Sequence, residues 1–443
     1  MKPVARLTLW FPGLVALASV TSTAIARPRT AWVTSWAASA QGPYPAAALV
    51  AQPDQTITIP DPARGARDQS FRMIVRPSVW GADMRVRFTN VFGTQPLTID
   101  GAFVGVQSAA ASLVRGSNRP VTFGGKRSVT IPVGADLWSD PVKLAPQIAQ
   151  GGPLLDGRKL AISFHVVGES GPITFHGKAM QTSYLSLPGA GSRGGGEGEA
   201  AFPYSITSWL FIDAVDMKPA TATPLVVCIG DSITDGTNST LNGDDRWPDQ
   251  LQRRFNAILP NGVAVVDEGI GSNRVTGPVP YGGFGGGPAA IERMSRDVVG
   301  LSGVKTVIWF EGVNDLTNGT SPQDLIAGLK RGVAILRAKI PGVRVIGVTM
   351  TPTLGGKGRS GTPDQDKERR EVNAFIRTGG LYDGVIDFEK AVTDPATGEL
   401  KPEFVFGTTI GGAGDKVHPN RAGYLAMASS IDLRVVLPGL PVR

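Results

Sequence analysis

Five short apolar runs alternate with stretches of helical periodicity between residues 225 and 388, and this alternation limits the fold more than any other feature. Short runs that are rich in Val and Ile indicate buried strands. Strands separated by helices indicate a parallel sheet covered by helices on both faces, and such sheets bind ligands at the carboxyl ends of their strands. The expected strands are 225–229, 263–266, 307–310, 343–348 and 385–388.

The helices expected between these strands follow from periodicity and capping. The clearest begins at Pro322, because Ser321 is a typical cap and proline is favoured in the first helical turn. Its apolar residues recur every three or four positions and form one stripe: Leu325, Leu329, Val333 and Leu336. Further helices are expected over 247–258, 289–299, 366–378 and 420–434.

The first half of the chain has a different pattern. From about residue 30 to 215, apolar and polar residues alternate in several places with a period of two, as in the run 84–88, which is typical of strands. Short strands separated by turn residues predict an antiparallel, β-sandwich-like domain over 27–217. The change of pattern after Met217 places an α/β domain over 218–443.

The first 26 residues have the pattern of a secretory signal. Lys2 and Arg6 precede an apolar stretch that ends at Val20, and small residues up to Ala26 stand at the spacing of a cleavage site. The alternative is an uncleaved membrane anchor, but a Pro-Gly pair interrupts the stretch, which is shorter than the roughly 20 residues needed to span a membrane. We therefore expect a signal peptide over 1–26 and a secreted or periplasmic mature protein with no integral membrane segment.

Charge and cysteine content exclude several functions. The formal net charge of +7 falls to +5 without the signal, and no run of five basic residues exists, so we expect no nucleic-acid partner. Cys228 is the only cysteine, which precludes an intramolecular disulfide, and we expect it to pack inertly in a strand. With one cysteine and one histidine after residue 218, a His-rich zinc site cannot form there, and we expect neither a metal nor another cofactor.

A candidate nucleophile follows the first expected strand, which leads directly into Gly230, Asp231 and Ser232. A serine in this loop can project its hydroxyl into the crevice above the sheet while its N–H faces a substrate oxygen. By itself the motif is weak, because an Asp-Ser pair after a strand is often a turn or a helix cap.

A candidate base and its partner precede the last expected helix. Of the three histidines, His165 and His176 belong to the strand-rich half and are expected to be structural or surface residues, which leaves His418. Asp415, three residues earlier, can accept the Nδ1 hydrogen of the imidazole and leave Nε2 free to take a proton from a serine. In the alternative interpretation, Asp415 is a solvated loop charge and His418 a turn residue.

A serine nucleophile also needs hydrogen-bond donors for the oxyanion that develops during attack. Gly271 and Ser272 follow the second strand and Asn314 follows the third, so all three are expected at the same edge of the sheet as Ser232. The alternatives are a glycine-rich βα turn at 269–272 and an Asx turn at Asn314.

Together these four segments resemble the four sequence blocks of the SGNH (GDSL-type) hydrolases, over residues 224–435. The resemblance implies a serine esterase with Ser232 as its nucleophile, His418 as its base and Asp415 as the orienter of that base. It also implies a flavodoxin-like, three-layer α/β/α fold for this part of the chain.

The same resemblance implies an oxyanion hole that combines Ser232, Asn314 and a backbone N–H from Gly271 or Ser272. Two positions depart from the family's pattern. Ile233 replaces the usual leucine of the first block, an apolar exchange of little consequence. Ser272 stands where the family usually has a glycine, so the choice between Gly271 and Ser272 stays open.

Longer strings, among them 246–248 and 418–424, are similar to those of exported acylhydrolases related to xylanase-associated arylesterases. Members of that subgroup often carry an N-terminal β-domain, to which 32–38 and 88–93 are similar. The resemblance implies acetyl or short-chain esters, first of all on a carbohydrate such as acetylated xylan. Aryl and lipid esters are the alternatives, and a non-catalytic carbohydrate-binding protein is the alternative of another class. The oligomeric state cannot be read from the sequence.

Two further expectations concern the reaction. Activity should fall in acid, because a protonated His418 cannot remove the Ser232 proton. The glycine-rich segment 278–288 is expected to form a wall or flap of the active site.

Overall fold

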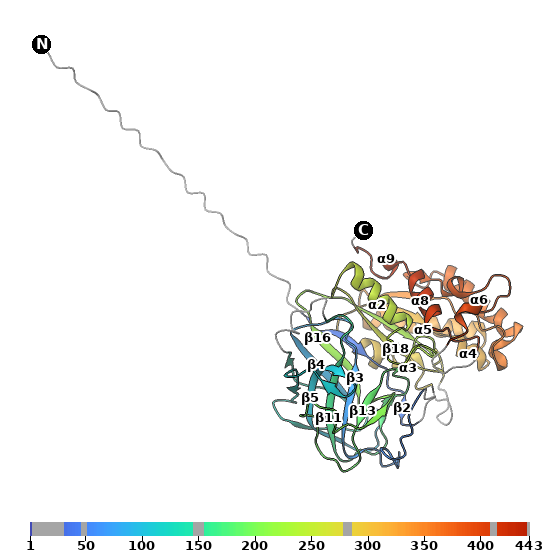
Figure 1. Cartoon of the computed structure of the whole chain (residues 1–443). Helices are drawn as coiled ribbons and strands as arrows, with labels where there is room; N and C mark the ends of the chain where they lie inside the picture. Colours follow the sequence, from blue (N-terminus) through green and yellow to red (C-terminus); the bar gives the residue numbers. More distant parts are fainter. Residues whose placement is uncertain (2–30, 46–50, 145–154, 278–285, 408–413, 441–443) are drawn as a thin grey trace.

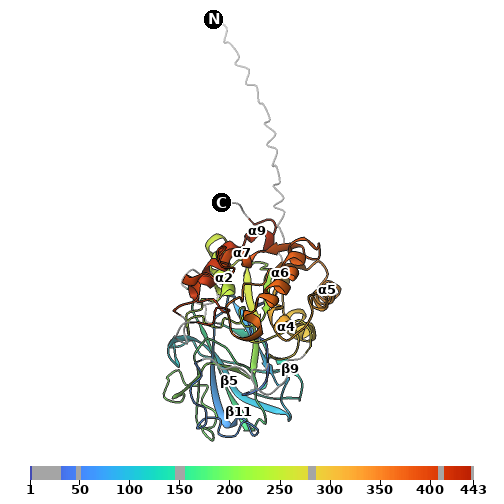
Figure 2. The ribbon, with the colours of Figure 1, turned by 90° about the vertical axis from the view of Figure 1, so that its right-hand side faces the viewer.

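The structure is a computed structural model that describes residues 1, 31–45, 51–144, 155–277, 286–407 and 414–440. Residues 2–26 of the expected signal peptide and residues 278–285 of the expected flap lie outside the described residues. In two perpendicular views the strand-rich first half and the helix-rich second half lie at opposite ends of the folded body (Figures 1 and 2). We call them the β-region, residues 31–218, and the α/β-region, residues 225–440.

Within the described residues, the β-region contains three sheets, and its named strands pair in antiparallel fashion, as the alternation predicts. The first sheet has the order β1 (Val33–Ala37), β16 (Ile212–Lys218), β4 (Asp83–Thr89) and β10 (Val142–Lys143), with β9 (Asp136–Trp138) also paired to β4. The second has the order β14 (Tyr204–Ile206), β13 (Ser183–Leu185), β3 (Arg67–Val75), β11 (Leu160–Glu169), β5 (Leu97–Ala109) and β6 (Ser112–Leu113), with β7 (Arg119–Pro120) and β8 (Ser128–Ile131) also on β5. The third contains β15 (Trp209–Leu210), β12 (Thr174–His176) and β2 (Gly42–Pro43).

An aromatic core joins the first two sheets. Phe88 of β4 meets Phe164 of β11 edge to face, with ring centroids 5.4 Å apart, and Phe164 stacks on Phe71 of β3 at 5.5 Å. All three rings are fully buried, and each contributes roughly 2 to 3 kcal/mol to folding relative to an exposed ring. The apolar positions of the run 84–88 therefore face this core.

The opposite face of the first sheet is covered by the α/β-region. Arg87 lies there, only 5% exposed, and donates from Nε to Asp213 at 2.6 Å and from Nη1 to the carbonyl oxygen of Gly300 at 3.4 Å. Val33 and Ala37 of β1 pack into the core of the α/β-region. Alternating arginines thus mark an interface between the two regions here.

A five-stranded parallel sheet forms the centre of the α/β-region, as the alternation of apolar runs predicts. Its order is β18 (Ala264–Gly269), β17 (Leu225–Gly230), β19 (Val304–Phe310), β20 (Arg344–Val348) and β21 (Gly384–Ile386). The chain enters at β17 and reverses direction across the sheet after β18, which places a switch point between β17 and β19. Crevices at such points, beyond the carboxyl ends of the strands, are the usual ligand sites of these sheets.

Helices follow each of these strands. They are α2 (Trp247–Ile258), α3 (Ala290–Met294) with the π-helical turn η2 (Ser295–Val299), α4 (Val313–Thr317), α5 (Pro322–Lys339), α6 (Pro363–Thr378), α7 (Phe388–Val392), α8 (Arg421–Ser430) and α9 (Leu433–Val436), together with the short 3-10 turns η3 (Gly358–Gly361) and η4 (Pro402–Phe404). Ser321 caps α5 by accepting the Asp324 N–H, as expected.

The parallel sheet has an apolar core on each face, because successive side chains of a strand point to opposite sides. Val227 and Ile229 of β17 pack with α5 and α6. Val226 and Cys228 pack with α2 and α8 on the other face. Figure 2 shows α5 and α2 on opposite sides of the α/β-region. Burial raises the pKa of the Cys228 thiol, which fits the inert packing expected for it.

Several element boundaries differ from the sequence-based expectation, and side-chain caps explain two of the differences. The strand expected over 385–388 ends at Ile386, because Asp387 accepts the Lys390 N–H at 3.1 Å and begins α7. The helix expected over 420–434 ends at Ser430, and α9 begins after Asp432, which accepts the Arg434 N–H at 2.9 Å.

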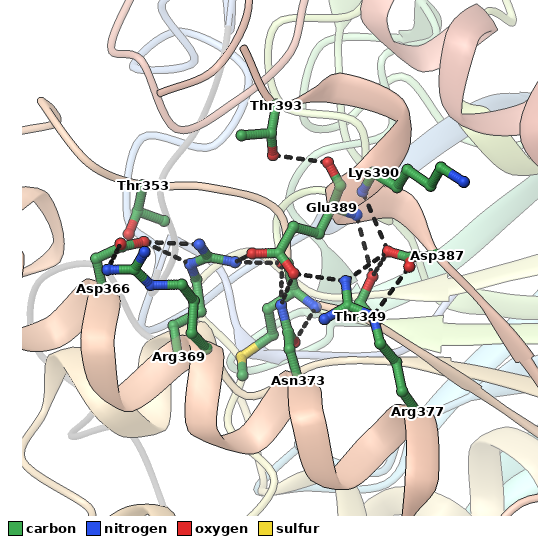
Figure 3. A network of polar contacts seen from close by, with 12 residues as sticks. Thr349, Thr353, Asp366, Arg369, Asn373, Arg377, Asp387, Glu389, Lys390 and Thr393 are labelled. Atoms are coloured by element: carbon green, nitrogen blue, oxygen red, sulfur yellow. Dashed lines mark hydrogen bonds and ion pairs between the residues drawn. The ribbon is translucent and has the colours of Figure 1, made fainter. Parts of the chain in front are cut away.

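A polar network ties α6 to the segment after β21 (Figure 3). Glu389 accepts hydrogen bonds from Arg369 at 2.6 Å and from Asn373 at 3.0 Å, and Arg377 pairs with both Glu389 and Asp387. Asn373 and Arg369 also donate to the carbonyl oxygen of Met350 just after β20. The network fixes the edge of the sheet that lies beside the last βα connections.

No helix among the described residues is long and apolar enough to cross a membrane.

Candidate active site

Ser232 lies in a tight turn directly after β17. Only glycine fits at position 230, because a Cβ there would lie 2.2 Å from Thr234 Oγ1 and 2.5 Å from the carbonyl oxygen of Phe310. The turn is closed by Gly236, whose N–H donates to the Ser232 carbonyl oxygen at 3.1 Å. The Ser232 N–H itself has no acceptor among the described residues. Backbone packing thus holds the serine at the carboxyl end of the strand and leaves its N–H unused.

His418 and Asp415 meet this serine from the loop before α8. His418 Nε2 lies 2.7 Å from Ser232 Oγ, and Nδ1 lies 2.5 Å from Asp415 Oδ2. The other Asp415 oxygen accepts the backbone N–H groups of Val417 at 3.0 Å and His418 at 2.8 Å. The structure therefore brings together the three side chains that the sequence singles out.

The charge of Asp415 is maintained by these contacts. Burial opposes ionisation, but the hydrogen bonds from His418 and Val417 outweigh it and hold the pKa of the Asp415 carboxyl well below its usual range. An ionised Asp415 accepts the Nδ1 hydrogen, so Nε2 presents its lone pair to the Ser232 hydroxyl.

The structure of the loop after β18 distinguishes between Gly271 and Ser272, the two candidate backbone donors that the sequence leaves open. The Gly271 N–H donates to Asp235 Oδ2 at 2.8 Å, so it is engaged within the protein. Ser272 has a φ of +65°, the left-handed conformation that glycine adopts most easily. Its N–H has no acceptor among the residues that the structure describes. Of the two N–H groups, that of Ser272 is available to a ligand.

Asn314 lies at the start of α4, after β19 and the left-handed Gly312, whose φ is +128°. Its Nδ2 donates to the carbonyl oxygen of Asn273 at 3.0 Å and lies 3.5 Å from Asp231 Oδ2. Asn314 therefore spans the gap between the Ser232 turn and the loop that carries Ser272. Burial raises the pKa of the Asp231 carboxyl to about 6, although the Ile233 N–H and His418 oppose this rise.

Arg293 of α3 is a site residue that the sequence does not reveal. Its fully buried guanidinium donates to Asn273 Oδ1 at 2.8 Å and to the carbonyl oxygens of Gly230 at 3.0 Å and Glu268 at 2.8 Å. These acceptors lie at the ends of β17 and β18 and in the loop that follows β18. One side chain thus fixes the backbone of the Ser232 turn and that of the loop that carries Ser272, which we call the oxyanion loop.

The two remaining histidines are both buried. His165 lies between Asp100, 2.6 Å from Nδ1, and Asp68, 2.8 Å from Nε2. His176 is 3% exposed and contacts Asp235 of the α/β-region, so the expectation of a structural residue fits it and that of a surface residue does not. Within the described residues, no group of three or more His, Cys, Asp or Glu side chains is placed to hold a metal ion.

A hydroxyl, an imidazole and a carboxylate in this order form a proton relay. Removal of the hydroxyl proton by His418 would make Ser232 a nucleophile, and the ionised Asp415 would stabilise the imidazolium that results. The adjacent N–H groups and the Asn314 amide are donors of the kind that stabilise an oxyanion.

Part of the chain matches a known protein family, and several solved structures are similar to it. Residues 228–426 match the model of the GDSL-like Lipase/Acylhydrolase family. A carbohydrate acetylesterase family member from Sinorhizobium meliloti is 17% identical, covering 48% of this chain and 99% of its own, with a TM-score of 0.38. A putative arylesterase from Agrobacterium tumefaciens str. C58 is 19% identical, covering 48% of this chain and 100% of its own, with a TM-score of 0.36. The M. Smegmatis aryl esterase is 16% identical with the same coverages and a TM-score of 0.38. A comparison with curated proteins finds no match.

Proposed function

Because residues 228–426 belong to the GDSL-like lipase/acylhydrolase family, the chain is a carboxylic ester hydrolase, and we propose that Ser232, His418 and Asp415 are its catalytic triad. The observation that carries this proposal is the continuous contact from Ser232 Oγ to His418 Nε2, at 2.7 Å, and from His418 Nδ1 to Asp415 Oδ2, at 2.5 Å.

The proposed reaction has two halves. In the first, Ser232 Oγ attacks the ester carbonyl carbon while His418 takes the hydroxyl proton, and the tetrahedral intermediate expels the alcohol, which receives that proton. In the second, His418 removes a proton from water, the resulting hydroxide attacks the acyl-enzyme, and Ser232 leaves with the proton restored. The products are an alcohol and a carboxylic acid, and no redox partner is involved.

The oxyanion hole of this proposal uses the N–H groups of Ser232 and Ser272 and the side chain of Asn314. The unused N–H of Ser232 and the left-handed conformation of Ser272 support it. Gly271 then serves indirectly, since its N–H is bound by Asp235. Each direct donor is expected to stabilise the transition state by about 3 to 4 kcal/mol.

The substrate is proposed to be an acetyl or short-chain ester on a carbohydrate such as acetylated xylan. Support comes from the sequence resemblance to exported acylhydrolases and from the signal pattern over 1–26. Export to the periplasm or medium, a flavodoxin-like three-layer arrangement over 218–443 and a separate domain over 27–217 belong to the same proposal.

The test is release of p-nitrophenol from p-nitrophenyl acetate by the mature protein beside its Ser232→Ala variant, with folding checked by circular dichroism. An active wild type and an inactive, folded variant are expected. Equal rates from the two proteins would contradict the assignment of Ser232. Acetylxylan and a long-chain triglyceride, assayed in parallel, separate a carbohydrate esterase from a lipid esterase, and the first is expected to be the better substrate.

A binding protein without catalysis is the second candidate, and the β-region is the feature that suggests it. Full-length Ser232→Ala protein incubated with insoluble xylan distinguishes the two. Retention on xylan together with a wild type that releases neither acetate nor p-nitrophenol would favour the binding protein.

A further inference from the structure

A histidine of the β-region reaches the loops that surround Ser232. His176, at the end of β12, donates from Nδ1 to the carbonyl oxygen of Ser39 at 2.9 Å, and its Nε2 lies 3.1 Å from Asp235 Oδ1. Both ring nitrogens face acceptors, so both contacts are hydrogen bonds only when the ring carries two N–H groups. His176 thus links the β-region directly to the carboxylate of Asp235.

A buried lysine approaches the same carboxylate. Lys178, two residues after β12, is 4% exposed, and its Nζ lies 2.7 Å from Thr237 Oγ1 and 3.7 Å from Asp235 Oδ2. Lysine is almost never buried to this extent without a partner, because transfer of an ammonium group from water is costly. Its backbone is fixed by Arg246, which donates to the carbonyl oxygens of Lys178, at 3.0 Å, and Ala179.

Asp235 transmits these contacts to the active site. Its fully buried carboxylate binds the Gly271 N–H at 2.8 Å, and its own N–H donates to the carbonyl oxygen of Asp231 at 2.9 Å. Burial alone would raise the pKa of the Asp235 carboxyl, but the charges of Lys178 and His176 outweigh burial and lower it. An ionised Asp235 therefore joins the turn that carries Ser232 to the loop that carries Ser272.

Little room is left for a side chain at position 271. A Cβ at position 271 would lie 2.6 Å from Lys178 Nζ and 3.4 Å from Asp235 Oδ2. The oxyanion loop thus packs directly on the ammonium group that the β-region supplies.

We propose that His176 and Lys178 are positioning residues for ester hydrolysis: acting through Asp235, they hold the Gly271–Ser272 loop in register with the Ser232 turn. All three oxyanion donors lie in the α/β-region, and the β-region then contributes by fixing their positions through Asp235. This inference rests on the proposed function of Ser232.

The expected kinetic signature follows from the role. A donor displaced by about 1 Å weakens the bond to the oxyanion much more than the binding of the neutral ester, so kcat should fall while KM changes little. We expect His176→Phe and Lys178→Met, which keep side-chain volume but remove the donors, each to lower kcat on p-nitrophenyl acetate about 10- to 100-fold. KM should stay within about threefold of wild type.

His165 provides the matched control. It is a buried histidine of the same region held between two carboxylates, those of Asp68 and Asp100, which both belong to the β-region. His165→Phe should lower the melting temperature and leave kcat within about twofold of wild type. The double variant His176→Phe/Lys178→Met should be no more than about twofold slower than the slower single variant, because both side chains act through one carboxylate.

Rates are expressed per active site, counted by stoichiometric reaction with a fluorophosphonate, so that unfolded molecules do not contribute. If Lys178→Met yields no folded protein, Thr237→Val removes the Nζ acceptor at nearly constant shape and should lower kcat about three- to tenfold. Unchanged kcat in the His176 and folded Lys178 or Thr237 variants, or an equal loss in His165→Phe, would overturn the positioning role. An inactive wild type, or one matched by Ser232→Ala, would instead overturn the proposed function itself.

Discussion

The two sides of the active site are assembled in different ways. On the base side, Asp415 and His418 are three residues apart, and their mutual contacts lie within the segment 415–418. On the oxyanion side, Ser272 and Asn314 come from different strand ends, and contacts between distant segments set their positions. The base side is a local structure, whereas the oxyanion side depends on the tertiary fold of the whole chain.

The two sides also differ in how they treat negative charge. Hydrogen bonds lower the pKa of Asp415, which keeps a carboxylate behind the imidazole. On the other side burial raises the pKa of Asp231 to about 6 and that of Glu311 to about 8. Asp231 and Glu311 are thus held closer to neutrality, whereas the Asp235 carboxylate of the same side stays ionised because Lys178 and His176 lower its pKa.

The largest loss of activity is expected from a substitution on the base side. His418→Ala removes the base, and kcat should fall about 10⁴- to 10⁶-fold, since the serine hydroxyl is a poor nucleophile without it. Steady-state rates on p-nitrophenyl acetate measure this loss, and circular dichroism controls for folding. A variant within tenfold of wild type would show that another group accepts the proton.

A loss of about 10⁴-fold is expected from Asp415→Asn. The amide can present a hydrogen to Nδ1 and so favour the tautomer whose Nε2 already carries a proton, which prevents it from accepting the Ser232 proton. The comparison with His418→Ala is made at equal enzyme concentration. If Asp415→Asn kept full activity, the local pair would not be the orienting device.

A smaller loss of activity is expected from a substitution on the oxyanion side. Asn314→Ala removes one donor, and kcat should fall about 10²- to 10³-fold with KM nearly unchanged. Titration with a boronic acid, whose adduct places an oxygen at the same position, should show a parallel loss of affinity. A rise in KM alone would assign Asn314 to substrate binding instead.

Glu311→Gln tests the raised carboxyl pKa values of the oxyanion side through the pH dependence of stability. Burial raises the pKa of Glu311 to about 8, partly opposed by Arg293 and Trp309, so the folded state binds this proton more tightly than the unfolded chain. Its stabilising contribution is therefore complete below about pH 4 and is lost as the pH rises to about 8. The variant should melt roughly 5 °C above wild type at pH 8.5 and show a smaller difference at pH 5, as measured by thermal denaturation. A difference that does not change with pH would contradict the raised pKa.

The smallest effect is expected at Ser272. Because its φ is +65°, Ser272→Gly should relieve strain and raise stability by up to about 1 kcal/mol, with kcat within about twofold of wild type. Ser272→Ala, which keeps the N–H but not the hydroxyl, is the control and should also remain active. A large loss in both variants would mean that the serine hydroxyl, rather than the backbone N–H, acts in the reaction.

The difference between the two sides also explains what the sequence could predict. Apolar runs and caps located the five parallel strands and most helix boundaries, and the three-residue spacing of Asp415 and His418 indicated their contact. The roles of His176, Lys178 and Arg293 were not predicted, because their partners lie 20 to more than 60 residues away and no periodicity links them. A histidine and a lysine at the end of a short strand were the only signal.

Ser272 stands where the family usually has a glycine, and its backbone conformation shows what this exchange involves. A glycine would adopt this left-handed conformation without strain, and the serine adopts it because the Gly271 N–H is fixed to Asp235 and the Asn273 side chain to Arg293. Tertiary contacts on both neighbours thus determine the local conformation, which residue type alone could not indicate.

The most direct test of the central claim is mass spectrometry of the mature protein after reaction with a fluorophosphonate. One phosphonyl group on the peptide that contains Ser232 is expected, with complete loss of esterase activity at one equivalent and much slower labelling of His418→Ala. Labelling of a different residue, or esterase activity that persists after Ser232 is fully modified, would contradict Ser232 as the nucleophile.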